Sequence, residues 1–312
     1  MATPVSPRAH RETQPNDWLS VASMTLLAFH LACLLVWVVG FSWVACLSGV
    51  ALYVLRMFGL SAGFHRGLAH RTYTTGRVVQ FLLAWCGTMA GQRGPLWWVA
   101  WHRQHHRYAD TAQDIHSPVV YGFWWAHLGW VLCRRYDGTE RAVVKDLMQY
   151  PELCWLDRYF FVPPVLLACG VFLVGLGLEC WVPSWHTSAM HMLVYGFIVS
   201  TTCLYHGTFT VNSCAHRFGR QRFPTGDASR NSYWIAVLTL GEGFHNNHHW
   251  YPSSERQGFY WWEFDGSHCL LTVCKWLGLV WALRVPPLHV LDTPTHLLSR
   301  SHSAATSSRR AK

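Results

Sequence analysis

Charged residues are scarce in this sequence. Only 13% of its 312 residues are Asp, Glu, Lys or Arg, whereas roughly a quarter of an ordinary soluble domain is charged. Half of the chain is hydrophobic (51%), and 19 residues are tryptophan. This balance excludes an ordinary soluble domain and predicts a membrane protein.

Motifs that would indicate several other functions are also missing. Without a GxGxxG or P-loop sequence, we do not expect the chain to bind its own dinucleotide. The HExxH motif of zinc hydrolases is absent, and so are the cysteine sets of structural zinc sites.

The eleven cysteines form no CxxC pair, and several fall in apolar runs, so we expect them to be reduced. No nucleic-acid-binding motif accompanies the net charge of +9, so membrane lipids are the expected partners and nucleic acid is not. Acidic proteins and phosphorylated substrates remain possible partners.

Long apolar runs predict an all-α, polytopic membrane protein. A helix needs about 20 apolar residues to cross a bilayer. We predict four transmembrane helices, at about residues 19–39, 42–63, 159–181 and 188–211. Arg56 falls inside the second span, near its cytoplasmic end, where we expect it to reach toward the lipid headgroups. The shorter apolar segments 78–90 and 268–283 suit helices that are re-entrant or lie along the membrane surface.

The positions of arginine and lysine predict the orientation. Eleven of them lie between Arg66 and Arg158 and another eleven between Arg217 and Lys312, whereas the turn near Gly40 and residues 180–187 contain none. Because cytoplasmic loops collect positive residues, both termini and the middle loop are expected in the cytoplasm. We predict one folded domain over residues 18–285, with disordered cytoplasmic tails at 1–17 and 286–312.

Histidines occur in four groups near the cytoplasmic ends of the predicted spans. Residues at i, i+3 and i+4 share one face of an α-helix, and this spacing holds within His102, His105 and His106. It holds again within His245, His248 and His249, and between Asn212 and His216. His65 and His70 are five apart, so their convergence requires a helix end or a distortion that the sequence does not reveal.

These groups predict a metal centre. Imidazole binds iron, copper, zinc and nickel, and nine imidazoles exceed what one ion can hold, so two ions are expected. A redox-active pair would require an external electron donor, because no reductase motif is present. Six other histidines stand alone, and we expect each to be a hydrogen-bonded core or interface residue: His30, His127, His186, His191, His206 and His268.

The motifs "GFHRGLAHR", "WHRQHHRYADTAQDIHSP", "VNSCAHRFG" and "GEGFHNNHHWYP", in this order, resemble the membrane fatty acid desaturases of the acyl-CoA delta-9 type. The resemblance covers roughly residues 43–287. It implies a di-iron centre held by a cytoplasmic helical cap on four transmembrane helices. The nine iron ligands that it implies are His65, His70, His102, His105, His106, His216, His245, His248 and His249. Asn212 matches an asparagine that holds an iron through water.

The resemblance also implies the activity: an oxygen-dependent desaturase that inserts a cis double bond, expected at carbon nine, into a stearoyl or palmitoyl chain. Gln92 and Trp98 match substrate-contacting residues, and Arg134 and Arg135 match a basic pair that could grip phosphates. An arginine and an acid of the animal enzymes are replaced by Ala100 and Trp101. The acyl carrier is therefore open between coenzyme A, acyl carrier protein and lipid.

Partners and alternatives follow from the same motifs. The expected electron donor is a separate ferredoxin or b-type cytochrome with its reductase. Arginine outnumbers lysine 22 to 3, which, with the resemblance to bacterial members, suggests a bacterial inner membrane. Trp97, Trp98 and Trp101 could line an acyl tunnel or form an aromatic belt at the membrane interface. A di-iron hydroxylase on the same scaffold is the alternative function, and a histidine-rich metal transporter or sensor is a distant one.

Overall fold

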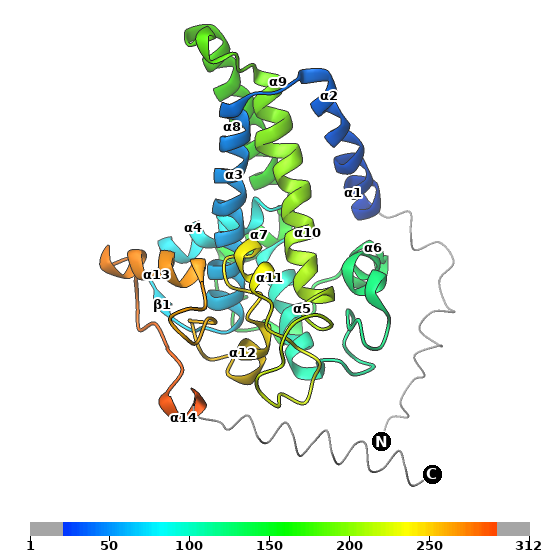
Figure 1. Cartoon of the computed structure of the whole chain (residues 1–312), viewed down its shortest axis with the longest axis vertical. Coiled ribbons are helices and arrows are strands. Elements are labelled where there is room, and N and C mark those ends of the chain that lie inside the picture. The colour runs from blue at the N-terminus through cyan, green and yellow to red at the C-terminus, as the bar shows by residue number, and fades with distance from the viewer. Residues whose placement is uncertain (1–20, 292–312) are drawn as a thin grey trace.

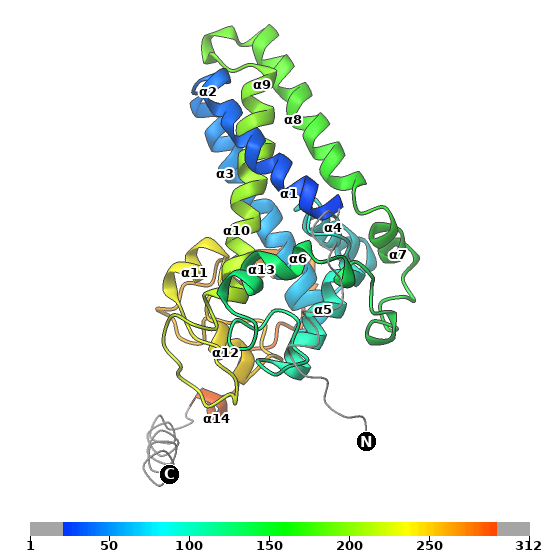
Figure 2. The same ribbon diagram turned by 90° about the vertical axis from the view of Figure 1, so that its right-hand side faces the viewer.

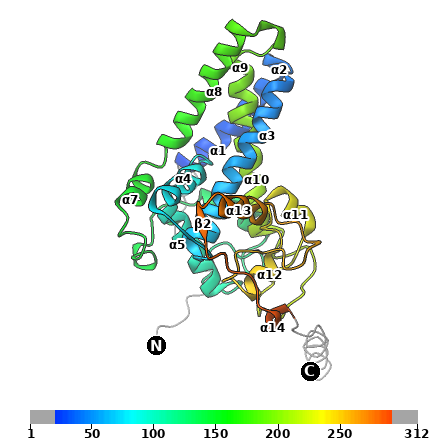
Figure 3. The same ribbon diagram turned by 90° about the vertical axis from the view of Figure 1, so that its left-hand side faces the viewer.

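The computed structural model describes residues 21–291 and has two parts, a stem of long helices and a cap of short helices and loops below it (Figure 1). In the stem, helices distant in the sequence pack side by side, as Figures 2 and 3 show. Strand structure is limited, in this described part, to one antiparallel pair of two-residue strands. The prediction of a mainly helical protein is therefore confirmed.

Three helices of the described part are long and apolar enough to cross a membrane: Ala22–Val39, Trp43–Ala69 and Val162–Trp181. The first is α1 (Val21–Ala32) extended by η1 (Cys33–Leu35) and α2 (Val36–Val39), the second is α3 (Trp43–Phe58) extended by the π-helix η2 (Gly59–Ala69), and the third is α8 (Val162–Trp181). The second is longer than predicted, because its helix continues past residue 63 as η2 into the cap. Gly40 makes the turn between the first two with a φ of 79°, a conformation that favours glycine.

The fourth predicted span is helical throughout, as α9 (Ala189–His191), the π-helix η7 (Met192–Val199) and α10 (Ser200–Ser213). It packs against α3 and α8 in the stem (Figure 1). It does not count among the three apolar helices, because serine, threonine and histidine make its lower half more polar.

The expectation for Arg56 is wrong. Its side chain is fully buried instead of reaching toward lipid headgroups. The guanidinium donates hydrogen bonds to Ser200 Oγ at 2.6 Å and to Thr201 Oγ1 at 2.5 Å. The hydroxyl groups of α10 therefore satisfy this cation between two stem helices, a partnership that sequence position alone does not reveal.

The cap is assembled from short elements of two chain segments, one between α3 and α8 and the other after α10. Its helices are α4 (Arg77–Thr88), α5 (Pro95–Tyr108), η3 (Trp125–Gly129), α6 (Trp130–Leu132), η4 (Arg134–Tyr136), η5 (Arg141–Val143), α7 (Pro151–Arg158), α11 (Tyr233–Leu238), α12 (His245–Trp250), α13 (Gly266–Trp276) and α14 (Leu288–Leu291). Strands β1 (Thr74–Thr75) and β2 (Val280–Trp281) pair antiparallel. Helices α4, α7, α11 and α13 surround the stem where it enters the cap (Figure 1), and segments 78–90 and 268–283 fall mainly in α4 and α13.

The tail predicted to be disordered from residue 286 begins with folded structure. Val290 of α14 is only 7% exposed and packs in a cluster with Phe223 and Phe259. Burial of this side chain explains why the chain stays folded past residue 285. The predicted N-terminal tail and the remainder of the C-terminal tail lie outside the described residues.

Three of the lone histidines form a hydrogen-bonded series that joins α1, α10 and η3. His30 Nδ1 donates to the Leu26 carbonyl at 2.7 Å, so His30 Nε2 accepts from His206 Nε2 at 2.9 Å. His206 Nδ1 then accepts from His127 Nε2 at 3.0 Å, and His127 Nδ1 lies 2.9 Å from Ser213 Oγ. Each imidazole is satisfied with one proton, so the series is neutral and suits an apolar setting.

The other lone histidines differ among themselves. His191 forms a capping box with Ser188, and His268 bonds Glu255 at 2.8 Å. The hydrogen-bonded interpretation is thus confirmed for these two and for the three of the series. His186 instead lies exposed at a left-handed turn.

Replacing His206 by Leu is expected to destabilise the protein, because it leaves the Nε2 atoms of His30 and His127 without their hydrogen-bond partners. A polar group left unsatisfied in an apolar setting costs about 1–3 kcal/mol. Thermal unfolding of the detergent-purified protein should show a lower midpoint. His289→Leu, which alters an exposed histidine of α14, is the matched control, and an equal shift in both variants would contradict the prediction.

Candidate metal centre

Nine histidines meet inside the cap in two groups of potential metal ligands. Within each group, one nitrogen from every ring lies within 4.8 Å of the others. The first group, here called the five-histidine group, contains His65, His70, His102, His106 and His248. The second, the four-histidine group, contains His105, His216, His245 and His249. The structure thus brings together all nine histidines that the sequence singled out.

The π-helix η2 supplies the distortion that the sequence did not reveal. In a π-helix the backbone hydrogen bonds run from residue i to i+5, and the amide of His70 donates to the His65 carbonyl at 3.1 Å. A spacing of five therefore returns to the same side of the helix. The two rings end with their centroids 4.8 Å apart.

Helices α5 and α12 each contribute to both groups. In α5, His102 and His106 belong to the five-histidine group, whereas His105 points to the other. In α12, His248 belongs to the five-histidine group, and its Nε2 lies 2.9 Å from His106 Nε2. His245 of α12 faces His216, with their Nε2 atoms 2.9 Å apart. The two groups are therefore adjacent, as a pair of cooperating ions requires.

Carboxylates hold the outer nitrogens of four of these rings. Asp114 accepts a hydrogen bond from His105 Nδ1 at 2.9 Å, and Asp110 accepts one from His216 Nδ1 at 2.9 Å. Asp227 accepts one from His249 Nδ1 at 2.8 Å, and Glu242 pairs with His65 Nδ1. Such a carboxylate fixes the tautomer and orientation of a metal-binding imidazole.

The sequence does not predict the partners of these carboxylates, although three of them lie within histidine motifs. Asp110 and Asp114 follow His106 by four and eight residues in the second motif, and Glu242 precedes His245 by three residues in the fourth. Asp227 lies outside these motifs, and only the fold brings Asp227 to His249 and Glu242 to His65. The buried His116, which was not singled out, packs on His105 with ring centroids 4.5 Å apart.

The facing nitrogens fit a cation. His105 and His249 both donate from Nδ1 to carboxylates, so their Nε2 atoms carry lone pairs when the rings are neutral. These two Nε2 atoms lie 3.3 Å apart, and no proton remains to join them. Two lone pairs facing each other repel, whereas a metal ion between them would use both. Imidazole nitrogens whose rings are hydrogen-bonded to carboxylates suit iron, copper or zinc as ligands.

The electrostatics favour unprotonated ligands. Burial, followed by repulsion from neighbouring histidines, lowers the pKa of His102, His106 and His248 well below the usual value. Burial alone would raise the pKa of Asp227. The hydrogen bond and electrostatic interaction with His249 outweigh burial and lower this pKa, so the carboxylate stays ionised. His102, His106 and His248 are thus neutral near pH 7, which is the form that binds metal.

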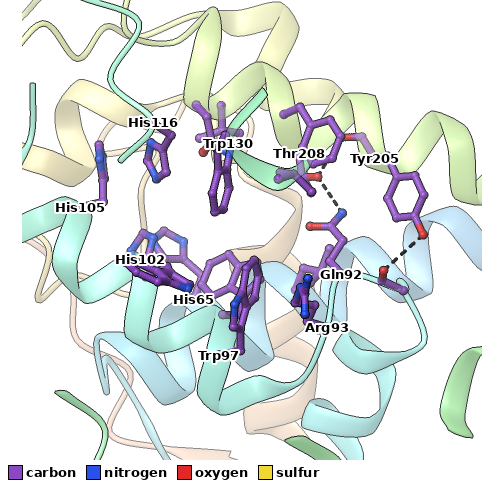
Figure 4. Close-up of a pocket in the computed structure, with 18 of the residues that line it drawn as sticks. His65, Gln92, Arg93, Trp97, His102, His105, His116, Trp130, Tyr205 and Thr208 are labelled. Carbon is purple, nitrogen blue, oxygen red and sulfur yellow. Dashed lines mark hydrogen bonds between the residues drawn. The ribbon is translucent and has the colours of Figure 1, made fainter. Parts of the chain in front are cut away.

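A cavity of about 270 Å³ adjoins both groups (Figure 4). His65 and His102 of the five-histidine group line it, together with His105 and His245 of the four-histidine group. Asn212, predicted to hold a metal through water, lines the same cavity. Most of the remaining wall is apolar or aromatic, with side chains from α1, α3, α5 and α10.

The predicted substrate contacts divide into two pairs. Gln92 and Trp98 line the cavity; Gln92 donates to Thr208 Oγ1 at 2.7 Å, and Trp98 stacks on His102. Arg134 and Arg135 lie exposed on η4 and are not among the residues that line the cavity.

The three tryptophans before and within the second histidine motif can now be assigned. Trp97, Trp98 and Trp101 all line the cavity, and Trp97 is only 6% exposed. The interpretation as an aromatic belt is therefore wrong for these three residues, and they form the wall of the internal cavity.

Comparison with known proteins gives a consistent result. The family model described as "Fatty acid desaturase" matches residues 41–268. The sn-1 stearoyl-lipid 9-desaturase of Anabaena variabilis is 35% identical over 274 residues, which are 86% of this chain and 94% of that protein. The sn-2 palmitoyl-lipid 9-desaturase of Nostoc sp. (strain 36) is 33% identical, covering 84% and 88% of the two chains. The acyl-CoA C20 Delta5-desaturase of Anemone leveillei is 34% identical, covering 91% and 88%.

Proposed function

Because the chain belongs to the fatty acid desaturase family, we propose that it is an oxygen-dependent di-iron enzyme that inserts a cis double bond at carbon nine of a saturated acyl chain such as stearoyl or palmitoyl. Its relatives are desaturases of acyl lipids and acyl-CoA. Two of the three relatives named above are 9-desaturases of lipid-linked chains, which supports this position for the double bond.

One observation carries the proposal: a single cavity joins an apolar, aromatic wall to histidines of both groups. An acyl chain in this cavity would lie with its methylenes against Trp98 and its neighbours and near His65, His102, His105 and His245. No side-chain acid or base can remove hydrogen from an unactivated methylene. Two iron ions held by the histidines would supply that oxidising power from O2.

The protein residues would position the chain and exclude water. The five-histidine group would hold one ion, and the four-histidine group, with Asn212 through water, would hold the other. The carboxylates behind His65, His105, His216 and His249 would keep the rings oriented. Overall, the acyl chain, O2, two electrons and two protons give the unsaturated chain and two water molecules.

The electrons would come from a separate donor, a ferredoxin or a b-type cytochrome with its reductase. The cationic segments of the cap would favour an acidic partner. We further propose that the helix from α9 to α10 is the fourth membrane span, and that the cap and both termini are cytoplasmic at a bacterial inner membrane. The arginine and lysine distribution supports this orientation.

The fatty acid profile of an expressing host tests the function. A host lacking its own desaturase would be fed deuterated stearate while it expresses the chain, with the empty vector as control. A new double bond between carbons nine and ten is expected, because an acyl chain in the cavity would have its methylenes next to the histidines and two of the named relatives are 9-desaturases. A hydroxylated product would establish the alternative reaction, and metal accumulation without either product would favour the transporter or sensor alternative.

A further inference from the structure

Two charged residues, Arg93 and Asp137, stand at the open end of the cavity. Apart from histidine, the charged residues lining it are these two and Glu242, and Glu242 is already paired with His65. The side chains of Arg93 and Asp137 are 20% and 41% exposed, whereas His65 at the metal end is only 4% exposed. The cavity therefore extends from this more exposed ion pair to the buried histidines. Figure 4 shows Arg93 on the cavity wall, away from His105.

The pair joins two segments across this opening. Arg93 precedes α5 and forms an ion pair with the Asp137 carboxylate, which follows η4. Its guanidinium also donates to the Asp137 carbonyl at 3.4 Å and lies 5.2 Å from the centre of the Trp97 ring. Trp97 Nε1 in turn donates to the Tyr136 carbonyl at 2.7 Å. Residues 136–137 are thus held against the start of α5 by Arg93 and Trp97 together.

The backbone of Arg93 indicates that its position is specified. Its φ is 65°, a left-handed conformation that is unfavourable for a side chain other than glycine and persists only where the surroundings enforce it. A glycine at position 93 would relieve the strain, as Gly91 two residues earlier adopts a similar φ of 69°. An arginine at this position suggests a role for its guanidinium at the opening.

The opening lies where two long stem helices begin. Ala22 in the first turn of α1 and Phe160, just before α8, line the same cavity. Arg134 and Arg135 are exposed on η4, directly before Asp137. Arg93 and Arg134 therefore lie on the two segments that meet at this end, where the polar part of an acyl substrate would remain, and arginine side chains there favour an anionic group.

We propose that Arg93 binds a phosphate oxygen of the carrier to which the acyl chain is attached, and that Asp137 holds the guanidinium until the phosphate replaces it. The inference rests on the proposed function in taking the cavity as the acyl site. Arginine suits phosphate because its planar fork can donate two parallel hydrogen bonds. Phosphate is common to phospholipids and to coenzyme A, whereas a galactolipid has none.

Equilibrium binding to the full chain in detergent, without an electron donor, tests this inference independently of turnover. The probes are radiolabelled stearoyl-CoA, distearoyl-phosphatidylglycerol and distearoyl-monogalactosyldiacylglycerol. Arg93→Gln is expected to weaken binding of a phosphate-bearing probe by about tenfold, the loss of a hydrogen bond to a charged group. Asp137→Asn is expected to strengthen binding of the same probe, by up to about fivefold, because a competing exposed ion pair is removed.

The matched control is a second ion pair of the cap, Arg77 with Glu152, which does not line the cavity. Arg77→Gln and Glu152→Gln should leave the binding of all three probes unchanged. The probe whose binding changes identifies the source of the phosphate, lipid or coenzyme A. Binding of the galactolipid should be unchanged in both Arg93→Gln and Asp137→Asn.

Weaker binding of the phosphate-bearing probe by Arg93→Gln and stronger binding by Asp137→Asn would support the inference. If the ion pair were purely structural, both substitutions would weaken binding. Shifts in the same direction, an equal effect on the galactolipid, or failure of the unaltered protein to bind either phosphate-bearing probe would overturn it. If the feeding experiment yields no double bond while the opposite shifts are found, the proposed function fails and the phosphate site stands. A double bond without these shifts removes only the inference about Arg93.

Discussion

Replacing His248 by Ala is expected to abolish the unsaturated product and to release metal from the five-histidine group. His248 Nε2 lies 3.0 Å from His65 Nε2 and 2.9 Å from His106 Nε2, so its ring occupies the centre of this group. Even the loss of a residue that only supports a ligand costs roughly 10–100-fold in metal affinity or activity, and the loss of a ligand should cost more. Iron per chain, measured by elemental analysis, and the fatty acid profile check the result.

Two further variants make this test specific. His216→Ala removes a ligand of the four-histidine group and should also abolish the product, but the iron that it releases comes from the other group. His289→Ala alters an exposed histidine of α14 and should retain both iron and product. Full iron content and normal product in the His248 variant would show that this group does not hold a catalytic ion.

Replacing Asp227 by Asn is expected to reduce iron affinity, and the product with it, by roughly 10–100-fold. The substitution keeps the size of the side chain but removes the charge that His249 Nδ1 now meets at 2.8 Å. His249 Nε2 then becomes a weaker donor to metal, and the ring loses its fixed tautomer. Titration of the iron-depleted protein with ferrous iron measures the affinity, and the feeding experiment measures the product.

The loss of iron affinity in the Asp227→Asn variant is expected to be the same under mildly acidic conditions, because the pKa of Asp227 is low. The hydrogen bond from His249 outweighs burial and lowers the pKa of this carboxyl well below its usual range. The carboxylate therefore remains charged throughout the physiological pH range, and the Asp227→Asn defect should not be rescued by changing the pH between about 6 and 8. Glu140→Gln, at an exposed carboxylate of the cap, is the control. Unchanged iron affinity in the Asp227 variant would mean that the carboxylate does not support the metal ligand.

Local spacing was sufficient to predict most of the candidate site. The i, i+3, i+4 pattern in residues 102–106 and 245–249 corresponds to α5 and α12, and both helices present their histidines inward. The structure brings the rings of His65 and His70 together, but this geometry was not predictable, because local composition does not distinguish a π-helix from an α-helix. The assignment of ligands to two groups depends on how α5 and α12 pack, and no spacing contains that information.

Interactions between residues distant in the chain could not be predicted from the sequence. Arg56 appeared to be a cation at the membrane edge, yet hydroxyls more than 140 residues away in α10 satisfy it. Glu242 reaches His65 across 177 positions, and Val290 is buried by aromatic residues far upstream. In each case the partner is chosen by packing, which brings together groups that have no relation along the chain.

The sequence by itself determined the membrane character, the helical fold and the grouped histidines, because hydropathy and residue spacing are local properties of the chain, and the order of its histidine motifs indicated the family. Only the tertiary structure decided which histidines share a group, which carboxylates hold their outer nitrogens, and where the apolar cavity meets them. It also placed Arg93 opposite Asp137 at the opening of that cavity. These features are long-range contacts, and their geometry exists only after the stem and cap have packed.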